Sequence, residues 1–434
     1  MKDNKRIINR NLILLLMGRM VSDTGTGIQM VVMPLYIIDA GGSAATVGLF
    51  SFLSLVPALL VYPFAGVLGD RINRKIIMVA TDLASAIVIV GLAFCSYSNR
   101  MSLTLLLVVQ VIVSLLYGLF DPATKGMLPR LVAGEELAQA NSTVASLRIL
   151  SGLLSPVVGA ALYANLGITV LFLINGISFL LSGSSEMLIR YQHAQRESTD
   201  GIRGFVTDLS EGIGFITAHK VIRKLCLFFL VIYALVQPIF TVVLPLFFRT
   251  RLNYSDTQYG YLQMAMILGA LLGSILVGLL FGKEKEANKS LVLGCSLLMG
   301  AMLAFSVVLL PHSLSVLGKD TVIYLALLAG VLCLLSAAIM FINVPVQTFI
   351  QRETPNEYMS RMFSIVGMIT KGGMPFGALI YGIILNRVEV YWAVLTATIV
   401  MTGISVVFLA LFLQNPRVGA ANLNEKAEMK REKQ

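Results

Sequence analysis

Long apolar runs that few charges interrupt constrain this chain more than any other feature of its sequence. The stretches 76–96, 103–120, 291–310 and 390–413 are the clearest of them. An α-helix rises about 1.5 Å per residue, so each stretch can cross the roughly 30 Å of hydrocarbon in a bilayer. Composition agrees, because 57% of the residues are hydrophobic and 13% are charged, against about 45–50% and about 25% in soluble domains. The sequence therefore predicts an all-α integral membrane protein.

The same pattern of apolar runs predicts 12 transmembrane helices. Their expected positions are 11–38, 45–67, 76–96, 103–121, 143–165, 168–189, 225–248, 258–281, 290–310, 321–343, 362–385 and 390–413. An even number of spans places both ends of the chain on the same side of the membrane.

The distribution of basic residues predicts which side that is. Most of the 33 Lys and Arg residues fall in the tails and in the loops on the side of the termini. The opposite side has Arg100, Arg249, Arg251, Lys319 and Arg387. By the positive-inside rule both termini are expected to be cytoplasmic. The expected location of this multi-pass protein is the plasma membrane of a bacterium. Topology and anionic lipid headgroups account for the net charge of +10, so nucleic acid is not an expected partner.

A hydrophilic stretch at 190–224 divides the chain into two halves of six spans each. The predicted domains are an N-terminal bundle at 1–189, a cytoplasmic linker at 190–224, a C-terminal bundle at 225–413 and a cytoplasmic tail at 414–434. Phe120-Asp121-Pro122 at the expected end of one span resembles the segment from Phe341 to Pro345 in the other half. A duplicated six-helix unit allows two bundles to rock about a site between them.

The cysteine and histidine residues do not have the spacing that is typical of a catalytic or metal-binding site. The four cysteines lie within predicted spans without metal-ligand spacing, and the three histidines lie in loops, so we expect no metal, no cofactor and no catalytic residues. A buried proton carrier would therefore have to be a carboxylate. The phosphate-binding pattern G-x-x-x-x-G-K-[ST] of ATP-driven pumps is also missing from the sequence.

A ten-residue motif connects the second and third predicted spans. Gly66-Val67-Leu68-Gly69-Asp70-Arg71-Ile72-Asn73-Arg74-Lys75 resembles the G-x-L-x-D-R-x-G-R-K signature of the major facilitator superfamily. Asn73 replaces the usual glycine, and asparagine accepts a left-handed backbone more readily than other non-glycine residues. The resemblance implies two pseudo-symmetric six-helix bundles. It also implies that Gly66, Asp70, Arg71 and Arg74 form a cytoplasmic latch between the halves, whereas the alternative is a basic loop that only obeys the positive-inside rule.

A finer resemblance concerns the end of the fourth span and the start of the fifth. The residues that carry it are Asp121-Pro122-Ala123, Pro129, Glu136, Asn141-Ser142, Arg148 and Pro156, together with the stretch 209–215. They resemble the branch that contains macrolide exporters and catecholate siderophore exporters, of the drug:proton antiporter type. Gln110 and Ser155 depart from the antiporter pattern, which prefers an arginine and a glycine in those helices.

Three ionisable residues are expected deep in the membrane. Arg19 and Asp23 are four residues apart and share one face of the first span, and Lys371 is similarly deep in span eleven. A charge at the bilayer centre costs about 2.5–3.5 kcal/mol, so these groups are expected to face the protein interior. One hypothesis is that Asp23 carries the coupling proton and that Arg19 and Lys371 tune its proton affinity. The other is a fixed Arg19–Asp23 ion pair.

Other charged residues lie closer to the predicted cytoplasmic ends. Asp82, Asp121 and Arg148 are expected to form a polar cluster under the Asp70 latch. Glu186 and Arg190 are four residues apart, and this spacing favours an interfacial salt bridge.

Candidates for substrate binding are polar or aromatic residues on helices that would line a cavity between the halves. They are Gln29, Tyr117, Tyr233, Gln237, Phe240 and Asn343, each of which could instead be an ordinary packing residue. Gly269 and Gly273 predict close helix packing.

The expected function is secondary active transport, namely proton-coupled efflux of a hydrophobic or amphipathic small molecule by a monomer. An importer or a lysophospholipid flippase on the same fold is the main alternative, and a channel is disfavoured by the repeat and the latch. The expected partners are the small-molecule substrate, protons and the lipid bilayer.

Overall fold

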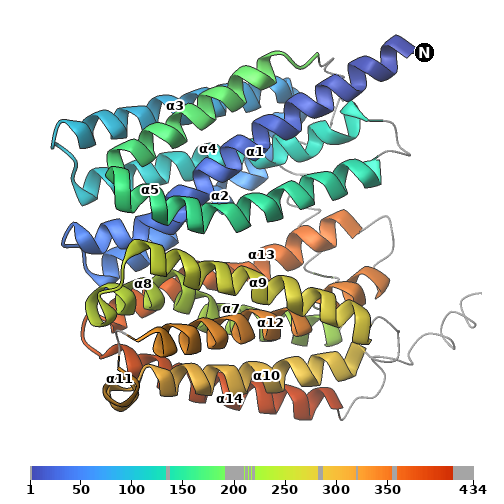
Figure 1. Ribbon diagram of the computed structural model, residues 1–434. Helices are drawn as coiled ribbons and strands as arrows, with labels where there is room; N and C mark the ends of the chain where they lie inside the picture. Colours follow the sequence, from blue (N-terminus) through green and yellow to red (C-terminus); the bar gives the residue numbers. More distant parts are fainter. Residues whose placement is uncertain are drawn as a thin grey trace, which may run out of the picture. The chain divides into compact units, whose positions relative to one another are not determined.

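The computed structural model describes residues 2–132, 137–190, 210, 214, 217, 220–281, 287–318, 321–353 and 359–413. The regular structure in these ranges is helical throughout (Figure 1). Glu136, most of the stretch 209–215, most of the expected linker and the tail 414–434 lie outside the described residues.

The first half of the chain folds into five long helices. These are α1 (Lys2–Asp39), α2 (Ala44–Arg71), α3 (Arg74–Tyr97), α4 (Leu103–Leu131) and α5 (Leu137–Met187). The last of them contains two predicted spans, because Gly167 has a φ of 72° and interrupts the helical backbone. Glycine tolerates this left-handed conformation without a steric penalty, so the break falls between the expected spans 143–165 and 168–189.

The second half begins with an irregular helical segment. It consists of α7 (Lys220–Pro238), the π-helical turn η2 (Ile239–Val243), α8 (Leu244–Phe247) and a second π-helical turn, η3 (Phe248–Leu252). The remaining helices are α9 (Asp256–Phe281), α10 (Ala287–Val308), α11 (Pro311–Leu317), α12 (Val322–Glu353), α13 (Met359–Ile384) and α14 (Val390–Leu413).

These helices confirm the predicted class, an all-α membrane protein of the 12-helix type. Nine described segments are long and apolar enough to cross a membrane, and one of them, Leu150–Met187, continues across the Gly167 break. Helix α3 illustrates why these helices are expected to be surrounded by lipid rather than by water. Its buried face includes Ile77 and Ser85, yet Ile87 and Phe94 on its exposed side are also apolar. A helix that is apolar all round belongs in a core or in a bilayer.

Several helices extend beyond their predicted ends. Helix α4 continues to Leu131 and α12 continues to Glu353, so Pro122 and Pro345 lie inside helices rather than at their ends. The short helix α11 was not predicted. The apolar pattern marks the lipid-embedded part of a helix, whereas these extensions contain polar residues that a hydropathy criterion does not include.

The turn between α2 and α3 differs from the expectation for Asn73. Its φ is −57°, so its backbone is not left-handed. Asn73 instead caps the N-terminus of α3, because its side-chain oxygen accepts a hydrogen bond from the backbone N–H of Lys75 at 3.0 Å. Asparagine is among the preferred residues for this role.

The described helices form two compact units. One contains Met1–Ser210 together with Pro238–Met264 and Met374–Arg387, and the other contains Glu211–Gln237, Ala265–Gly373 and Val388–Gln434. The divisions in α7 and α13 fall directly before Pro238 and one residue before Pro375. The domain limits 189, 224 and 413 expected from the sequence stay a prediction.

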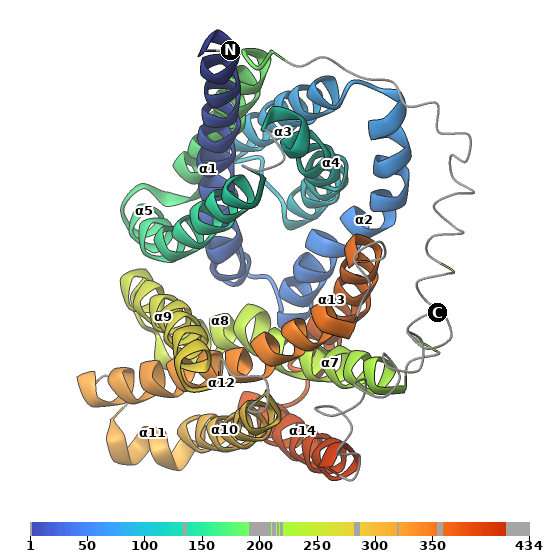
Figure 2. The same cartoon turned by 90° about the vertical axis from the view of Figure 1, so that its right-hand side faces the viewer.

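Close contact between α1 and α5 organises the first unit (Figure 2). A methyl group at Gly25 would overlap the side chains of Ser178 and Asn175, and one at Gly27 would overlap Ser155. Since glycine has no side chain, α1 can approach both parts of α5. This packing turns the charged face of α1 toward the interior of the unit.

At its other end, α1 joins a charged network that belongs to the same unit. The guanidinium of Arg249 pairs with Asp39 at 2.9 Å and also with Asp256. The hydroxyl of Tyr163 donates a hydrogen bond to Asp39 at 2.8 Å. One arginine therefore links the C-terminus of α1, the turn η3 and the N-terminus of α9.

In the second unit, the predicted close packing at Gly269 and Gly273 is confirmed. A methyl group at Gly269 would overlap the carbonyl oxygen of Cys333, and one at Gly273 would lie 2.7 Å from atoms of Ala337. Helix α9 therefore packs on the backbone of α12. Helix α10 packs against both α12 and α14.

The substitution Gly269→Ala tests this packing. The added methyl group has no room against the α12 backbone, so we expect a loss of stability of about 1–3 kcal/mol. The measurement is thermal unfolding of the purified protein in detergent. Gly278→Ala, on the same helix, is the matched control because no atom lies within 4 Å of its added methyl group. Equal unfolding temperatures for the two variants would contradict the close contact.

Candidate transport site

A cavity of about 350 Å³ lies within the first unit among α1, α2, α3, α4 and α5. Its wall includes nine hydroxyl or amide side chains and four that are charged or phenolic. These are Ser22, Thr26, Ser54, Thr81, Ser85, Gln110, Ser114, Ser151 and Ser155, with Asp23, Asp82, Tyr117 and Arg148. Met30, Leu116, Phe120 and Phe179 add apolar surface. Such a wall suits an amphipathic ligand.

The hydroxyl groups of this wall are largely occupied as donors. Ser54 donates to the carbonyl of Phe50, Thr81 to that of Ile77 and Ser155 to that of Ser151, with distances of 2.7–2.8 Å. A serine or threonine in a helix commonly bonds back to the preceding turn in this way. The remaining lone pairs of these oxygens are acceptors. These oxygens can therefore accept hydrogen bonds from a ligand in the cavity.

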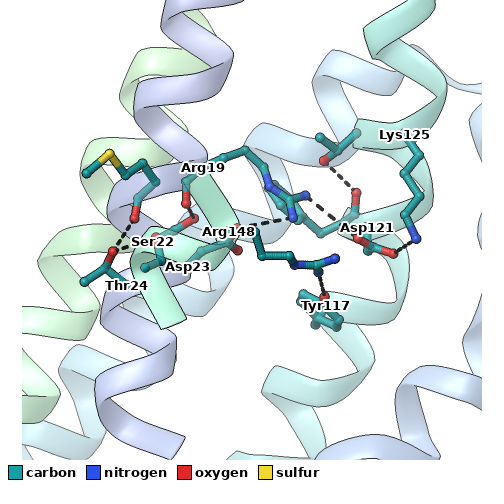
Figure 3. Close-up of polar contacts among 12 residues, drawn as sticks. Arg19, Ser22, Asp23, Thr24, Tyr117, Asp121, Lys125 and Arg148 are labelled. Atoms are coloured by element: carbon teal, nitrogen blue, oxygen red, sulfur yellow. Dashed lines mark hydrogen bonds and ion pairs between the residues drawn. The ribbon is translucent and has the colours of Figure 1, made fainter. Parts of the chain in front are cut away.

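Arg19 is the central cation beside the cavity (Figure 3). Its guanidinium lies 3.4 Å from Asp23 and 3.9 Å from Asp121, and it is 5.4 Å from the ring centroid of Phe120. Arg19 and Asp121 are both buried. One guanidinium thus compensates carboxylates on two helices, α1 and α4, as a delocalised fork of donors can.

The neighbouring charges extend this network toward solvent. Asp121 also pairs with Lys125 at 2.7 Å, and the Lys125 side chain is 69% exposed. Arg148 donates a hydrogen bond to the hydroxyl of Tyr117 at 3.1 Å, as Figure 3 shows. The negative charge of Asp121 therefore has one cationic partner in the interior of the protein and one at its surface.

The structure places the predicted Arg19–Asp23 pair in contact and turns Asp23 toward the cavity. Lys371 belongs to α13, but its side chain lies outside the described residues. The role of these three residues in proton coupling stays a prediction.

The predicted cluster of Asp82, Asp121 and Arg148 is divided between two environments. Asp121 and Arg148 act electrostatically on one another near Tyr117, whereas Asp82 faces α5 near Gly183. Asp82 and Arg148 both line the cavity. The cluster was expected beneath Asp70, whose side chain lies outside the described residues.

Of the expected latch residues, Arg74 is described most fully. It begins α3, and its guanidinium donates a hydrogen bond to the carbonyl oxygen of Gly126 on α4. Gly66, Asp70 and Arg71 belong to the last turns of α2, and the side chains of Asp70 and Arg71 lie outside the described residues. The latch stays a prediction.

The candidate substrate residues occupy different environments. Tyr117 lines the cavity. Gln29 is buried and accepts a hydrogen bond from Asn175, and Phe240 is buried in η2. In the second unit, the hydroxyl of Tyr233 donates to Asn343 at 3.0 Å. Gln237 lies near the end of α7. Their contact with a substrate stays a prediction.

Sequence reasoning missed the importance of Glu186. It is fully buried and neither carboxylate oxygen has a hydrogen-bond partner, so the predicted salt bridge with Arg190 is wrong. Helix α5 ends at Met187, and the four-residue spacing aligns two side chains only within a continuous helix. The backbone of Arg190 exchanges two hydrogen bonds with the side chain of Asn11 instead.

A polar, charge-lined cavity inside a bundle of apolar spanning helices defines the class of protein as a multi-pass membrane transporter. The family model of the Major Facilitator Superfamily matches residues 15–378. The chain belongs to this family, as the motif at 66–75 predicted.

Two groups of relatives resemble the chain over most of its length. It is 25% identical over 390 residues to "Macrolide efflux protein A" of Streptococcus pyogenes, covering 88% of this chain and 92% of the relative. It is 23% identical over 423 residues to "Multidrug efflux pump Tap" of Mycolicibacterium fortuitum, covering 96% and 98%. The resemblance to the macrolide-efflux branch is thereby confirmed.

Solved structures show the same fold at low sequence identity. A point mutant of the nucleoside transporter NupG has a TM-score of 0.71 and 13% identity, covering 93% of this chain and 99% of that one. A bacterial homologue of the iron transporter ferroportin, in an inward-facing state, has a TM-score of 0.67 and 16% identity, covering 92% and 98%.

The substitution Arg19→Gln tests the central ion network. It leaves the carboxylates of Asp23 and Asp121 without their shared cation, so we expect a loss of about 3–5 kcal/mol in the free energy of unfolding. Denaturant titration of the purified protein measures it. Lys125→Gln removes the exposed partner of Asp121 and should cost less than about 1 kcal/mol. A similar cost for both variants would show that Arg19 does not carry the network.

Proposed function

We propose that this protein exports a cationic, amphipathic small molecule in exchange for protons, by alternating access. The observation that carries the proposal is Asp23, a carboxylate that faces a cavity rich in acceptor oxygens while its side chain remains 23% exposed. A carboxylate in this position can bind either a proton or a cationic substrate. Competition between the two ligands for one group is a simple physical basis for antiport.

Arg19 influences how readily Asp23 exchanges a proton for a cationic substrate. It contacts Asp23 and Asp121 from one position, so protonation of Asp23 leaves the guanidinium with a second carboxylate partner. The cost of neutralising Asp23 is reduced because Arg19 does not become an unpaired buried charge. Lys371 is included in the proposal as a third participant that would tune the proton affinity of Asp23.

The names of the relatives support export of drug-like compounds. The similar proteins of S. pyogenes and M. fortuitum are a macrolide efflux protein and a multidrug efflux pump. We therefore place macrolide-like drugs first among the candidate substrates and siderophores second. Tyr117, at the cavity wall, is the aromatic residue most suited to contact an apolar part of such a molecule.

The remaining features of the proposal concern location and mechanism. The chain is placed in the bacterial plasma membrane as a monomer with cytoplasmic termini, in agreement with the distribution of Lys and Arg. Transport proceeds without covalent chemistry. In one phase of the cycle, the cytoplasmic side is held closed by Asp70, Arg71 and Arg74. The contact of Arg74 with α4 supports its part in positioning the turn between α2 and α3.

The substitution Asp23→Asn tests the proposal directly. In everted membrane vesicles energised by a proton gradient, the wild-type protein is expected to accumulate a radiolabelled macrolide or a cationic dye, and a protonophore should abolish the accumulation. The amide of the variant cannot titrate, so gradient-driven accumulation should fall to the level of vesicles without the protein. Glu389→Gln, which alters an exposed carboxylate, is the matched control and should transport normally.

Other outcomes would overturn particular parts of the proposal. Unchanged gradient-driven transport by the Asp23→Asn variant would exclude Asp23 as the proton carrier. Substrate movement out of everted vesicles would indicate an importer, and movement of a labelled lysophospholipid between leaflets would indicate a flippase. A siderophore that is transported in place of the macrolide and the dye would change the substrate class.

A further inference from the structure

A second acidic site lies in the first unit, apart from the Arg19–Asp23 contact. Glu186 is 0% exposed and Asp82 is 2% exposed. Both oxygens of Glu186 and one oxygen of Asp82 are buried without a hydrogen-bond partner. Buried polar atoms are almost always hydrogen-bonded in proteins, so three such carboxylate oxygens together require an explanation.

Helix packing brings these groups to one place. Asp82 faces Gly183, where an added methyl group would lie 3.4 Å from the Asp82 Cβ. Ser182 and Glu186 flank this contact on α5, and residues four apart in a helix lie on the same face. Asp82 and Glu186 also act electrostatically on each other. Because glycine at 183 allows α3 to approach, both carboxyl groups lie in the region between α3 and α5.

The surrounding charges do not neutralise this pair. From α1, Arg19 acts on both carboxyl groups, but its guanidinium contacts Asp23 and Asp121. From α3, the ammonium group of Lys75 donates to the carbonyl of Met187 at 2.7 Å. Asp23 on α1 adds further negative charge near Asp82. Two like charges that interact in a buried site disfavour the state in which both are ionised.

We propose that Asp82 and Glu186 form a proton-binding site in which one exchangeable proton is shared between the two carboxyl groups. Asp82 lines the cavity, so its carboxylate can accept a proton from a hydronium ion there, which leaves a water molecule. The Asp82 carboxyl then donates this proton to a carboxylate oxygen of Glu186, and Asp82 returns to its ionised form. The reverse transfers release the proton to the cavity.

A proton fits this site better than a metal cation. Among the described residues, no group of three or more His, Cys, Asp or Glu side chains is arranged to hold a metal ion. A proton needs only one donor and one acceptor oxygen, and it can pass through Asp82 to the fully buried Glu186. The site therefore gives the transporter a second proton-binding group, distinct from Asp23.

Infrared difference spectroscopy of the purified full-length protein tests the site without a substrate. A protonated carboxyl group gives a C=O stretching band that shifts in D₂O. We expect one such band to lose its intensity as the pH is raised from mildly acidic to mildly alkaline. Glu186→Gln should remove this titrating band, and Asp82→Asn should move its midpoint. Glu389→Gln, at an exposed carboxylate, should leave it unchanged.

Three results would overturn the proposal. They are a titrating band that is the same in Glu186→Gln as in the wild type, a band that does not change with pH, and a band that disappears at constant pH when Na⁺ replaces choline. Gel filtration and thermal unfolding check that each variant is folded. If the Glu186→Gln variant is not folded, the test rests on the shift of the band midpoint in Asp82→Asn. Because the measurement needs no transport, its failure is distinguishable from failure of the efflux assay.

Discussion

The interaction on which the first unit depends is the contact of one buried guanidinium with two carboxylates. Helices satisfy their own backbone hydrogen bonds, so in lipid the ionised side chains are the groups that still need partners. Arg19 supplies that partner for Asp23 on its own helix and for Asp121 on α4. This contact keeps the charged face of α1 turned toward the cavity, and the glycines of α1 that face α5 make the approach sterically possible.

The carboxyl groups of this unit fall into two kinds. Asp23 and Asp121 each form an ion pair with Arg19, whereas Asp82 and Glu186, on α3 and α5, form none among the described residues. The cavity touches both kinds, through Asp23 and Asp82. A single cavity in the bundle thus has access to two acidic groups whose electrostatic surroundings differ.

The sequence was sufficient to predict most of the spans, the family and the Arg19–Asp23 contact, because each depends on local composition or on spacing within one helix. Even the break at Gly167 falls between two predicted spans. Glu186 was misassigned because its environment depends on where α5 ends and on which helix packs against it. Asn73 was expected to be left-handed, but the same side chain serves equally well as a helix cap, and only the backbone conformation distinguishes the two. Tertiary packing, which no short motif encodes, decides such cases.

The prolines beside the unit divisions have a mechanical consequence. Proline has no amide hydrogen, so the helix lacks one backbone hydrogen bond at that residue, and its ring also disfavours a straight course. Pro238 stands where α7 leaves one unit and changes to a π-helical turn, and Pro375 stands at the corresponding point of α13. Each helix is therefore easier to bend at its proline than along an uninterrupted helical segment. A bend in α7 or α13 would be concentrated at that residue instead of being spread along the helix.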